Sequence, residues 1–154
     1  VEVMGRNCGD IALYSGLAGG AGSIIVPEID YDIDKICEKS LRAKNRGKLH
    51  NIIILAEGVG NPYELAEILN EKTGLETKVT VLGYLQRGGT PTTIDRIMAS
   101  EMGRKAIELL IQNRTNKVLG IKCNNIFDMD ITEALSMKKI FDIDMYKTAD
   151  ILSL

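Results

Sequence analysis

The sequence contains few residues of the kinds that build metal centres or disulfide frameworks. Its 154 residues include three cysteines, Cys8, Cys37 and Cys123, and a single histidine, His50. The cysteines are odd in number and far apart, and no pair has the spacing of zinc ligands. We therefore predict no metal site, and we expect reduced, mostly buried thiols in a cytoplasmic protein.

An excess of one charge and long apolar runs are also missing. The formal net charge is -2 at pH 7, which argues against nucleic-acid and membrane-surface proteins because these usually carry a basic face. No apolar run is long enough to span a bilayer. The start "VEVMGRNCGD" lacks the basic and apolar parts of a signal peptide. It reads instead as the inside of a strand, so we expect the chain to be a piece of a longer protein.

The residues that are present are typical of a globular α/β protein. Hydrophobic residues make up 45 % of the chain and charged residues 26 %, as in proteins with a normal folded core. Five short runs rich in Val and Ile are predicted as strands: "VEVMG", "SIIVPE", "NIIILAEG", "KVTVLG" and "KVLGIKC". Their continuous apolarity predicts strands that are buried on both faces.

Helical patterns separate these runs. Apolar spacing and stop signals predict helices at 10–18, 33–44, 62–72 and from Thr92 or Thr93 to about 112, with shorter ones near 131–137 and 145–152. Asn61 is expected to cap the third helix and Gly74 to end it. The alternation predicts right-handed βαβ crossovers. We therefore predict one α/β domain, a three-layer doubly wound fold with a mainly parallel sheet and flanking helices.

Polar side chains follow three of the predicted strands. Arg6 follows "VEVMG", Glu57 follows "NIIILA", and Arg87 follows "KVTVLG" within the stretch "GYLQRGGTP". Ligands of parallel sheets gather at the carboxyl ends of strands. The two arginines could hold a phosphate by charge-assisted hydrogen bonds, and a carboxylate accepts from sugar hydroxyls. Together they suggest a site for a phosphorylated polyol, although each residue alone also fits a surface ion pair or a turn.

A second basic cluster lies in "NRGKLH" before the third strand. Arg46, Lys48 and His50 alternate there and could converge on an anion. The alternative is a helix end at which basic residues complement the helix dipole.

Two acidic pairs are present, and one common phosphate-binding motif is missing. The pairs Asp128/Asp130 and Asp142/Asp144 lack calcium-loop spacing and are predicted to be caps and turns. No Gly-rich phosphate loop with a following Lys-Ser or Lys-Thr is present. Glu57 is counted as the only carboxylate at a strand end, so the chain is expected to supply half of an active site.

These motifs resemble a known family. The stretches "VEVMGRNCGDIALYSGLAGGA", "AEGVG" and "KVTVLGYLQRGGTPTTIDR" are similar to bacterial ATP-dependent 6-phosphofructokinase, in order along essentially the whole chain. The resemblance implies that residues 1–154 are the sugar-phosphate-binding, carboxy-terminal half, without the nucleotide-binding half and its catalytic base. The full-length enzyme would use ATP and Mg²⁺ to phosphorylate the 1-hydroxyl of fructose 6-phosphate in glycolysis. This chain alone would bind neither cofactor and would be inactive.

The resemblance also implies a role for individual residues. Arg87 would hold the 6-phosphate, and Arg6 would act catalytically by stabilising the charge of the transferred phosphoryl group. Lys78 takes the place of an arginine that reaches the substrate of a neighbouring subunit, and Tyr84 takes the place of a substrate-binding histidine. The full implied substrate-binding set is Met4, Gly5, Arg6, Glu57, Lys78, Tyr84, Leu85, Gln86 and Arg87.

An effector site between the subunits of a homotetramer is implied as well. Its ligand would be a nucleotide diphosphate or phosphoenolpyruvate. Its residues would be Gly20, Ala21, Gly22, Arg46, Lys48, Leu49 and His50. Gly22 stands where the family usually has a glutamate that helps to hold the effector's magnesium. The departures at Lys78, Tyr84 and Gly22 predict altered affinity or regulation rather than a new reaction.

Two other functions stay open on the sequence. The chain could be a stand-alone, non-catalytic module that senses a sugar phosphate or a nucleotide. It could also belong to a pyrophosphate-dependent phosphofructokinase, because the donor would be selected outside these residues.

Overall fold

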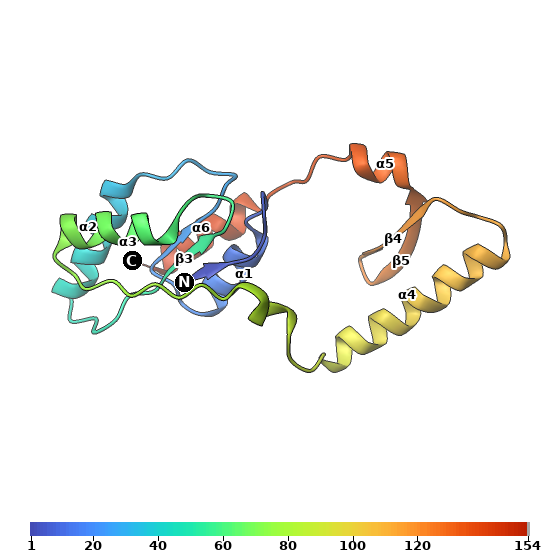
Figure 1. Ribbon diagram of the computed structural model, residues 1–154, viewed down its shortest axis with the longest axis horizontal. Helices are drawn as coiled ribbons and strands as arrows, with labels where there is room; N and C mark the ends of the chain where they lie inside the picture. The colour runs from blue at the N-terminus through green and yellow to red at the C-terminus, as the bar shows by residue number, and fades with distance from the viewer. Residues whose placement is uncertain (154) are drawn as a thin grey trace. The chain divides into compact units, whose positions relative to one another are not determined.

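The computed structural model describes residues 1–153, which form two compact units. Unit 1 comprises Val1–Gly88 together with the chain from Phe141 onward, and unit 2 comprises Gly89–Ile140 (Figure 1). The sequence pattern predicted a mainly parallel sheet built from the five apolar runs. The structure differs because the run "KVLGIKC" forms a hairpin inside unit 2 and does not join the parallel sheet.

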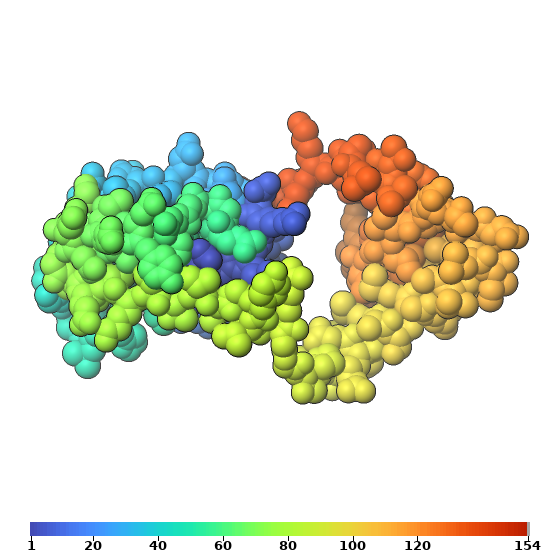
Figure 2. Space-filling model, viewed as in Figure 1, coloured from blue at the N-terminus to red at the C-terminus, as the bar shows by residue number. Residues whose placement is uncertain are grey.

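Unit 1 alternates strands and helices. Its elements are β1 (Glu2–Val3), α1 (Asp10–Ala18), β2 (Ser23–Ile25), α2 (Ile33–Asn45), β3 (Ile53–Ala56), α3 (Pro62–Thr73), the 3₁₀ helix η1 (Gly83–Arg87) and α6 (Ile143–Leu152). The bounds of α1, α2 and α3 agree with the predicted helices to within one residue at each end. The space-filling view shows the atoms of residues 1–88, coloured blue to yellow-green, packed closely together in one body (Figure 2).

The sheet of unit 1 is parallel, with the strand order β1-β3-β2. Residues 80–82 extend it beyond β1: Glu2 N donates to Thr80 O at 2.8 Å, and Leu82 N donates to Glu2 O at 3.1 Å. The run "KVTVLG", predicted as a full strand, is reduced to this parallel bridge between Glu2 and Val81. The carboxyl ends of four parallel segments therefore meet at one edge.

Helices cover both faces of this sheet, and the strand residues alternate between two cores. Ile24 and Ile54 join the core that contains Leu13 of α1 and Ala149 of α6. Ile25 and Leu55, the next residues in each strand, join the core of α2 and α3. The three-layer α/β fold is confirmed, and so is burial on both faces for β2 and β3, because side chains on a strand alternate between faces. The same prediction is wrong for "KVTVLG", which forms only a bridge, and for "KVLGIKC", which has no buried residue in its strand.

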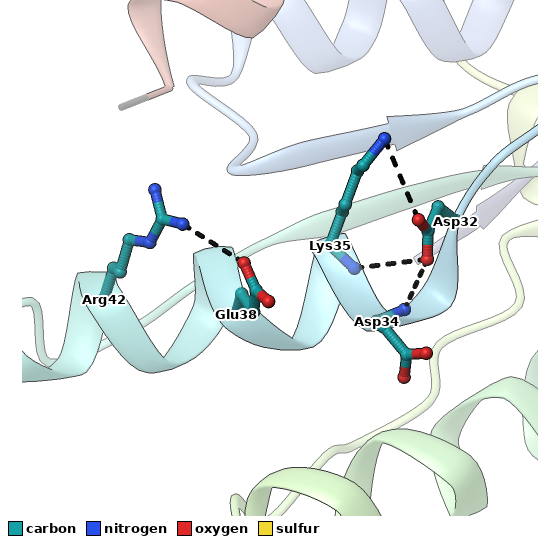
Figure 3. Close-up of polar contacts among 5 residues, drawn as sticks. All are labelled: Asp32, Asp34, Lys35, Glu38 and Arg42. Atoms are coloured by element: carbon teal, nitrogen blue, oxygen red, sulfur yellow. Dashed lines mark hydrogen bonds and ion pairs between the residues drawn. The ribbon is translucent and has the colours of Figure 1, made fainter.

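Local capping explains where the helices begin and end. Asp32 Oδ1 accepts from the backbone N–H groups of Asp34 (2.9 Å) and Lys35 (3.4 Å) at the start of α2 (Figure 3). Further along the same exposed helix face, Arg42 pairs with Glu38 at 3.1 Å. Each cap satisfies backbone donors that have no partner within the helix.

The predicted bounds of α3 are confirmed by the same chemistry. The Asn61 side chain accepts from Tyr63 N at 2.9 Å. Gly74 ends the helix with a φ of 64°, a left-handed conformation that glycine adopts without a Cβ clash.

Unit 2 contains one long helix and a hairpin. Its elements are α4 (Thr93–Ile111), β4 (Lys117–Lys122), β5 (Asn125–Asp130) and α5 (Ile131–Ser136). Strands β4 and β5 are antiparallel, and Cys123 and Asn124 form the turn between them with φ values of 49° and 61°. The sequence predicted β4 but not β5.

Two of the four residues in the acidic pairs are helix caps and two are not, since Asp144 lies inside the first turn of α6. Asp130 and Asp142 cap α5 and α6 through the N–H groups of Thr132 and Met145, which confirms the predicted caps. Asp128 is instead a strand residue of β5, so its prediction as a cap or turn is wrong. Its carboxylate pairs with Arg114 and Lys105, side chains that the hairpin brings beside it.

The cysteines only partly match the expectation of buried thiols. Cys37 is buried in the core of α2 and α3, and this burial raises the pKa of its thiol, so the thiol stays protonated. Cys8 is half-buried, whereas Cys123 is exposed at the hairpin turn. Within residues 1–153, no helix is both long and apolar enough to cross a bilayer.

We expect Leu13→Ala to lower the free energy of unfolding of this chain by roughly 2–5 kcal/mol, because it removes a fully buried side chain and leaves a cavity. Leu13 is 0 % exposed in the core beside α1. Urea unfolding followed by circular dichroism measures the change. Leu49→Ala is the matched control, because Leu49 is 97 % exposed, and an equal effect of both substitutions would contradict this description of the core.

Candidate functional site

The loop Met4–Gly9, called the Arg6 loop below, leaves β1 at the carboxyl edge of the sheet. Cys8 N donates to Gly5 O at 3.0 Å and closes a turn. A Cβ on Gly5 would lie 2.2 Å from Cys8 O, so only glycine fits there. Arg6 has a φ of 51°, a conformation that is uncommon and strained for a non-glycine residue and is often found at functional sites.

Glu57 holds this loop from the end of β3. Its Oε1 accepts from Arg6 N at 2.7 Å and from Gly5 N at 3.3 Å. The next residue, Gly58, packs directly on the loop, since a Cβ there would lie 1.8 Å from Arg6 O. A carboxylate can accept several hydrogen bonds, and Glu57 Oε2 has no partner within residues 1–153. The end of β3 therefore fixes the loop and leaves an acceptor oxygen for a ligand.

The η1 turn approaches the loop from the other side. Gln86 Oε1 accepts from Met4 N at 2.7 Å. The Arg87 guanidinium carbon lies 5.5 Å from the centroid of the Tyr84 ring, which is cation–π geometry. Tyr84 is 81 % and Leu85 78 % exposed. The structure thus brings Met4, Gly5, Arg6, Glu57 and Gln86 into direct contact and places Tyr84, Leu85 and Arg87 on the adjoining turn.

Sequence reasoning missed Glu28 at this edge. It follows β2, and its Oε1 and Oε2 accept from Gly9 N at 2.8 and 3.0 Å. The expectation that Glu57 is the only strand-end carboxylate is therefore wrong. The signal was present, because Glu28 ends the apolar run "SIIVPE" just as Glu57 follows "NIIILA".

Lys78 lies apart from the other predicted substrate residues. It precedes the 80–82 segment, which runs parallel to β1, so Lys78 is at the amino edge of the sheet and Arg87 at the carboxyl edge. Its ammonium lies 3.4 Å from Glu76 Oε1 in an exposed ion pair. Within this chain, Lys78 does not join Arg6 and Glu57.

The first predicted effector segment lies beside the start of β3, which follows the second segment. Gly20 has a φ of 66° after α1, and Gly22 N donates to Ile52 O at 2.8 Å. Ile52 lies two residues after His50, so this bond places Gly22 close to the end of the segment Arg46–His50. Arg46, Lys48, Leu49 and His50 are all exposed, and Lys48 N donates to Ala43 O at 3.0 Å as α2 ends.

The space beside Gly22 is occupied. A Cβ at this buried position would lie 1.9 Å from Asn51 Oδ1. The Asn51 side chain is itself held, because its Nδ2 donates to the buried Ser40 Oγ at 3.0 Å. Any side chain at position 22 would therefore have to displace Asn51.

A cleft of about 500 Å³ lies in unit 1 next to this segment. Its polar lining includes Lys48, His50 and Lys78, and its apolar lining includes Leu65 and Leu69 of α3. The cleft therefore joins part of the predicted effector segment to Lys78 rather than to the substrate residues at the opposite edge.

Comparison with known proteins assigns the chain to a family. The family model for phosphofructokinase matches residues 1–110. The chain belongs to the phosphofructokinase family. A curated relative from Alkaliphilus metalliredigens, named ATP-dependent 6-phosphofructokinase, is 60 % identical over 154 residues, which are all of this chain and 48 % of the relative. The chain thus spans about half the length of the curated relatives that it matches.

Solved phosphofructokinase structures share its fold. A structure of phosphofructokinase from Saccharomyces cerevisiae matches with a TM-score of 0.80 and 32 % identity, covering 87 % of this chain and 19 % of that one. A pyrophosphate-dependent phosphofructokinase from Marinobacter aquaeolei matches with a TM-score of 0.79 and 25 % identity, covering 93 % and 41 %. The α/β fold class is therefore confirmed for this phosphofructokinase segment.

Proposed function

We propose that this chain is the fructose 6-phosphate-binding part of a cytoplasmic, glycolytic ATP-dependent 6-phosphofructokinase. The observation that carries the proposal is the carboxylate of Glu57, which is fixed against the Arg6 loop at the carboxyl edge of a parallel sheet. This is the edge at which such sheets bind ligands. The names of the curated relatives support ATP rather than pyrophosphate as the donor.

The residues at this edge have complementary chemistry for a sugar phosphate. The exposed guanidinium of Arg87 donates to the 6-phosphate in charge-assisted hydrogen bonds. Glu57 accepts from a sugar hydroxyl through Oε2, because Oε1 is used by the backbone. The Arg6 guanidinium, on a backbone held by Glu57, stabilises the negative charge of the transferred phosphoryl group. The substrate also contacts the remaining residues at this edge, which are Met4, Gly5, Leu85 and Gln86.

The nucleotide, the metal ion and the catalytic base are assigned to the rest of the full-length protein. Within residues 1–153, no three His, Cys, Asp or Glu side chains are grouped so that they could hold a metal ion. ATP supplies the phosphoryl group when it is bound. The part played by this chain is to bind the acceptor, orient its 1-hydroxyl and stabilise charge.

The effector segments are proposed to bind an anion, a nucleotide diphosphate or phosphoenolpyruvate, between subunits of a homotetramer. Three observations support this role: the Gly22–Ile52 hydrogen bond, which brings Gly22 near the end of the basic segment, the exposed basic side chains of Arg46 and Lys48, and the position of Lys78 away from its own substrate edge. Gly22 supplies no carboxylate, so magnesium would contribute less to effector binding here than in relatives with glutamate.

A coupled assay of the full-length protein tests the proposed function. We expect phosphorylation of fructose 6-phosphate with ATP and no activity from the isolated 154-residue chain. Turnover with pyrophosphate alone would favour the pyrophosphate-dependent alternative. Binding of the sugar phosphate by the full-length protein without any turnover would favour a sensing module. Kinase activity of the isolated chain would contradict the division of roles.

Tyr84→His is expected to leave fructose 6-phosphate affinity of the full-length protein equal or improved. The substitution removes a ring that lies 5.5 Å from the Arg87 guanidinium and restores the residue implied by the family resemblance. A cation–π contact at such an exposed site is worth only about 0.5–1 kcal/mol. Isothermal titration calorimetry measures the affinity, and a marked loss would refute the expectation.

A further inference from the structure

Glu28 supports the end of the Arg6 loop that Glu57 does not reach. Both carboxylate oxygens of Glu28 lie within 3.0 Å of Gly9 N. Gly9 is buried and occupies the N-cap position of α1, where it has no side chain to cap the helix. The Glu28 carboxylate, which follows β2, instead accepts from the N–H of Gly9 itself, one of the helix's first donors without a partner in the helix. Its negative charge is also favourable at the positive end of a helix.

Gly9 is the last residue of the Arg6 loop, and it packs directly against residues that follow β2. A Cβ on Gly9 would lie 2.5 Å from Val26 Cβ and 2.6 Å from Glu28 Oε2, so the backbone rests directly on the end of β2. The neighbouring residue, Cys8, donates its N–H to Gly5 O and closes the turn around Arg6. The loop is thus held at its start by Glu57 and at its end by Glu28.

We propose that Glu28 is a positioning residue for Arg6. A left-handed φ of 51° at Arg6 persists only when the surrounding structure enforces it, and two carboxylates from neighbouring strands supply that constraint. Without Glu28, Gly9 N loses its acceptor and the turn relaxes, so the Arg6 guanidinium leaves its productive position more often. This proposal rests on the proposed function, because Arg6 is assigned there to the phosphoryl group.

The test compares Glu28→Ala and Glu28→Gln in the full-length protein. We expect Glu28→Ala to lower kcat/KM for fructose 6-phosphate about tenfold with the KM for ATP unchanged, because only acceptor-side geometry is disturbed. Glu28→Gln keeps an acceptor oxygen for Gly9 N and should stay within about threefold of the wild type. Glu38→Ala is the matched control: it removes a carboxylate whose partner is Arg42 on the exposed side of α2.

Hydrogen–deuterium exchange of the same full-length variants tests the loop itself. The peptide that covers Met4–Gly9 should exchange faster in Glu28→Ala than in the wild type or in Glu38→Ala. If Glu28→Ala does not fold, Glu28→Asp replaces it, because the shorter side chain draws the carboxylate away from Gly9 N and should produce the same defect.

Either of two results would overturn the role of Glu28. One is wild-type kcat/KM and wild-type exchange in Glu28→Ala or its Asp substitute. The other is a Glu28→Gln variant as defective as Glu28→Ala, which would show that the hydrogen bond to Gly9 N is not what matters. A full-length wild type with no phosphofructokinase activity would contradict the proposed function instead, and the exchange measurement would still decide the role of Glu28.

Discussion

Arg87→Ala in the full-length protein should raise the KM for fructose 6-phosphate and lower kcat/KM by roughly ten- to hundredfold. The guanidinium lies on η1 at the carboxyl edge of the sheet, and in this structure it contacts the face of Tyr84. A hydrogen bond to a charged group contributes about 1.5–3 kcal/mol, which corresponds to a loss of that size. The thermal midpoint should change little, because the contact with Tyr84 is exposed and weak.

Two further variants make this result specific. Arg87→Lys keeps the charge and loses the two-pronged donor, so its kcat/KM should fall between those of the wild type and Arg87→Ala. Arg42→Ala removes an exposed arginine that pairs with Glu38 on α2 and should leave steady-state kinetics unchanged. An unaltered KM and kcat/KM in Arg87→Ala would remove Arg87 from the substrate site.

The helices of this chain were predictable from the sequence because their signals are local. Asn61 and Gly74 mark the ends of α3 through a side-chain cap and a left-handed glycine, and both depend only on nearby residues. Strand β5 was not predictable in the same way. Its polar residue Asp128 is stabilised by Arg114 and Lys105 from other parts of unit 2, and sequence spacing does not reveal such tertiary partners.

The carboxyl-edge rule predicted where Arg6 and Glu57 would meet, and the hydrogen bond from Arg6 N to Glu57 Oε1 confirms that placement. The same rule also places Glu28 at this edge. Its contact with Gly9 at the start of α1, however, depends on tertiary packing that the sequence does not show. Gly22 illustrates the same limit. The family resemblance implied only that a carboxylate is missing at this position, whereas the structure adds that Asn51 occupies the space that a side chain would need.

Gly58→Ala is expected to lower kcat/KM for fructose 6-phosphate about a hundredfold in the full-length protein. The added Cβ would lie 1.8 Å from Arg6 O, far inside van der Waals contact, and the obstacle is backbone that cannot rotate away. Either the end of β3 or the Arg6 loop must move, which separates Glu57 from Arg6 N. A misplacement of about 1 Å at a reacting group is enough for a loss of this size.

Gly60→Ala is the matched control for this prediction. Gly60 lies two residues further along the same loop, and a Cβ there would meet nothing within 4 Å. Both substitutions restrict the unfolded chain equally, so the difference between them isolates the contact with Arg6. We expect Gly60→Ala to keep kcat/KM within about twofold of the wild type. Equal kinetics in the two variants would mean that the Arg6 loop does not rest on the end of β3 in the working protein, and the assignment of Arg6 and Glu57 to one site would fall with it.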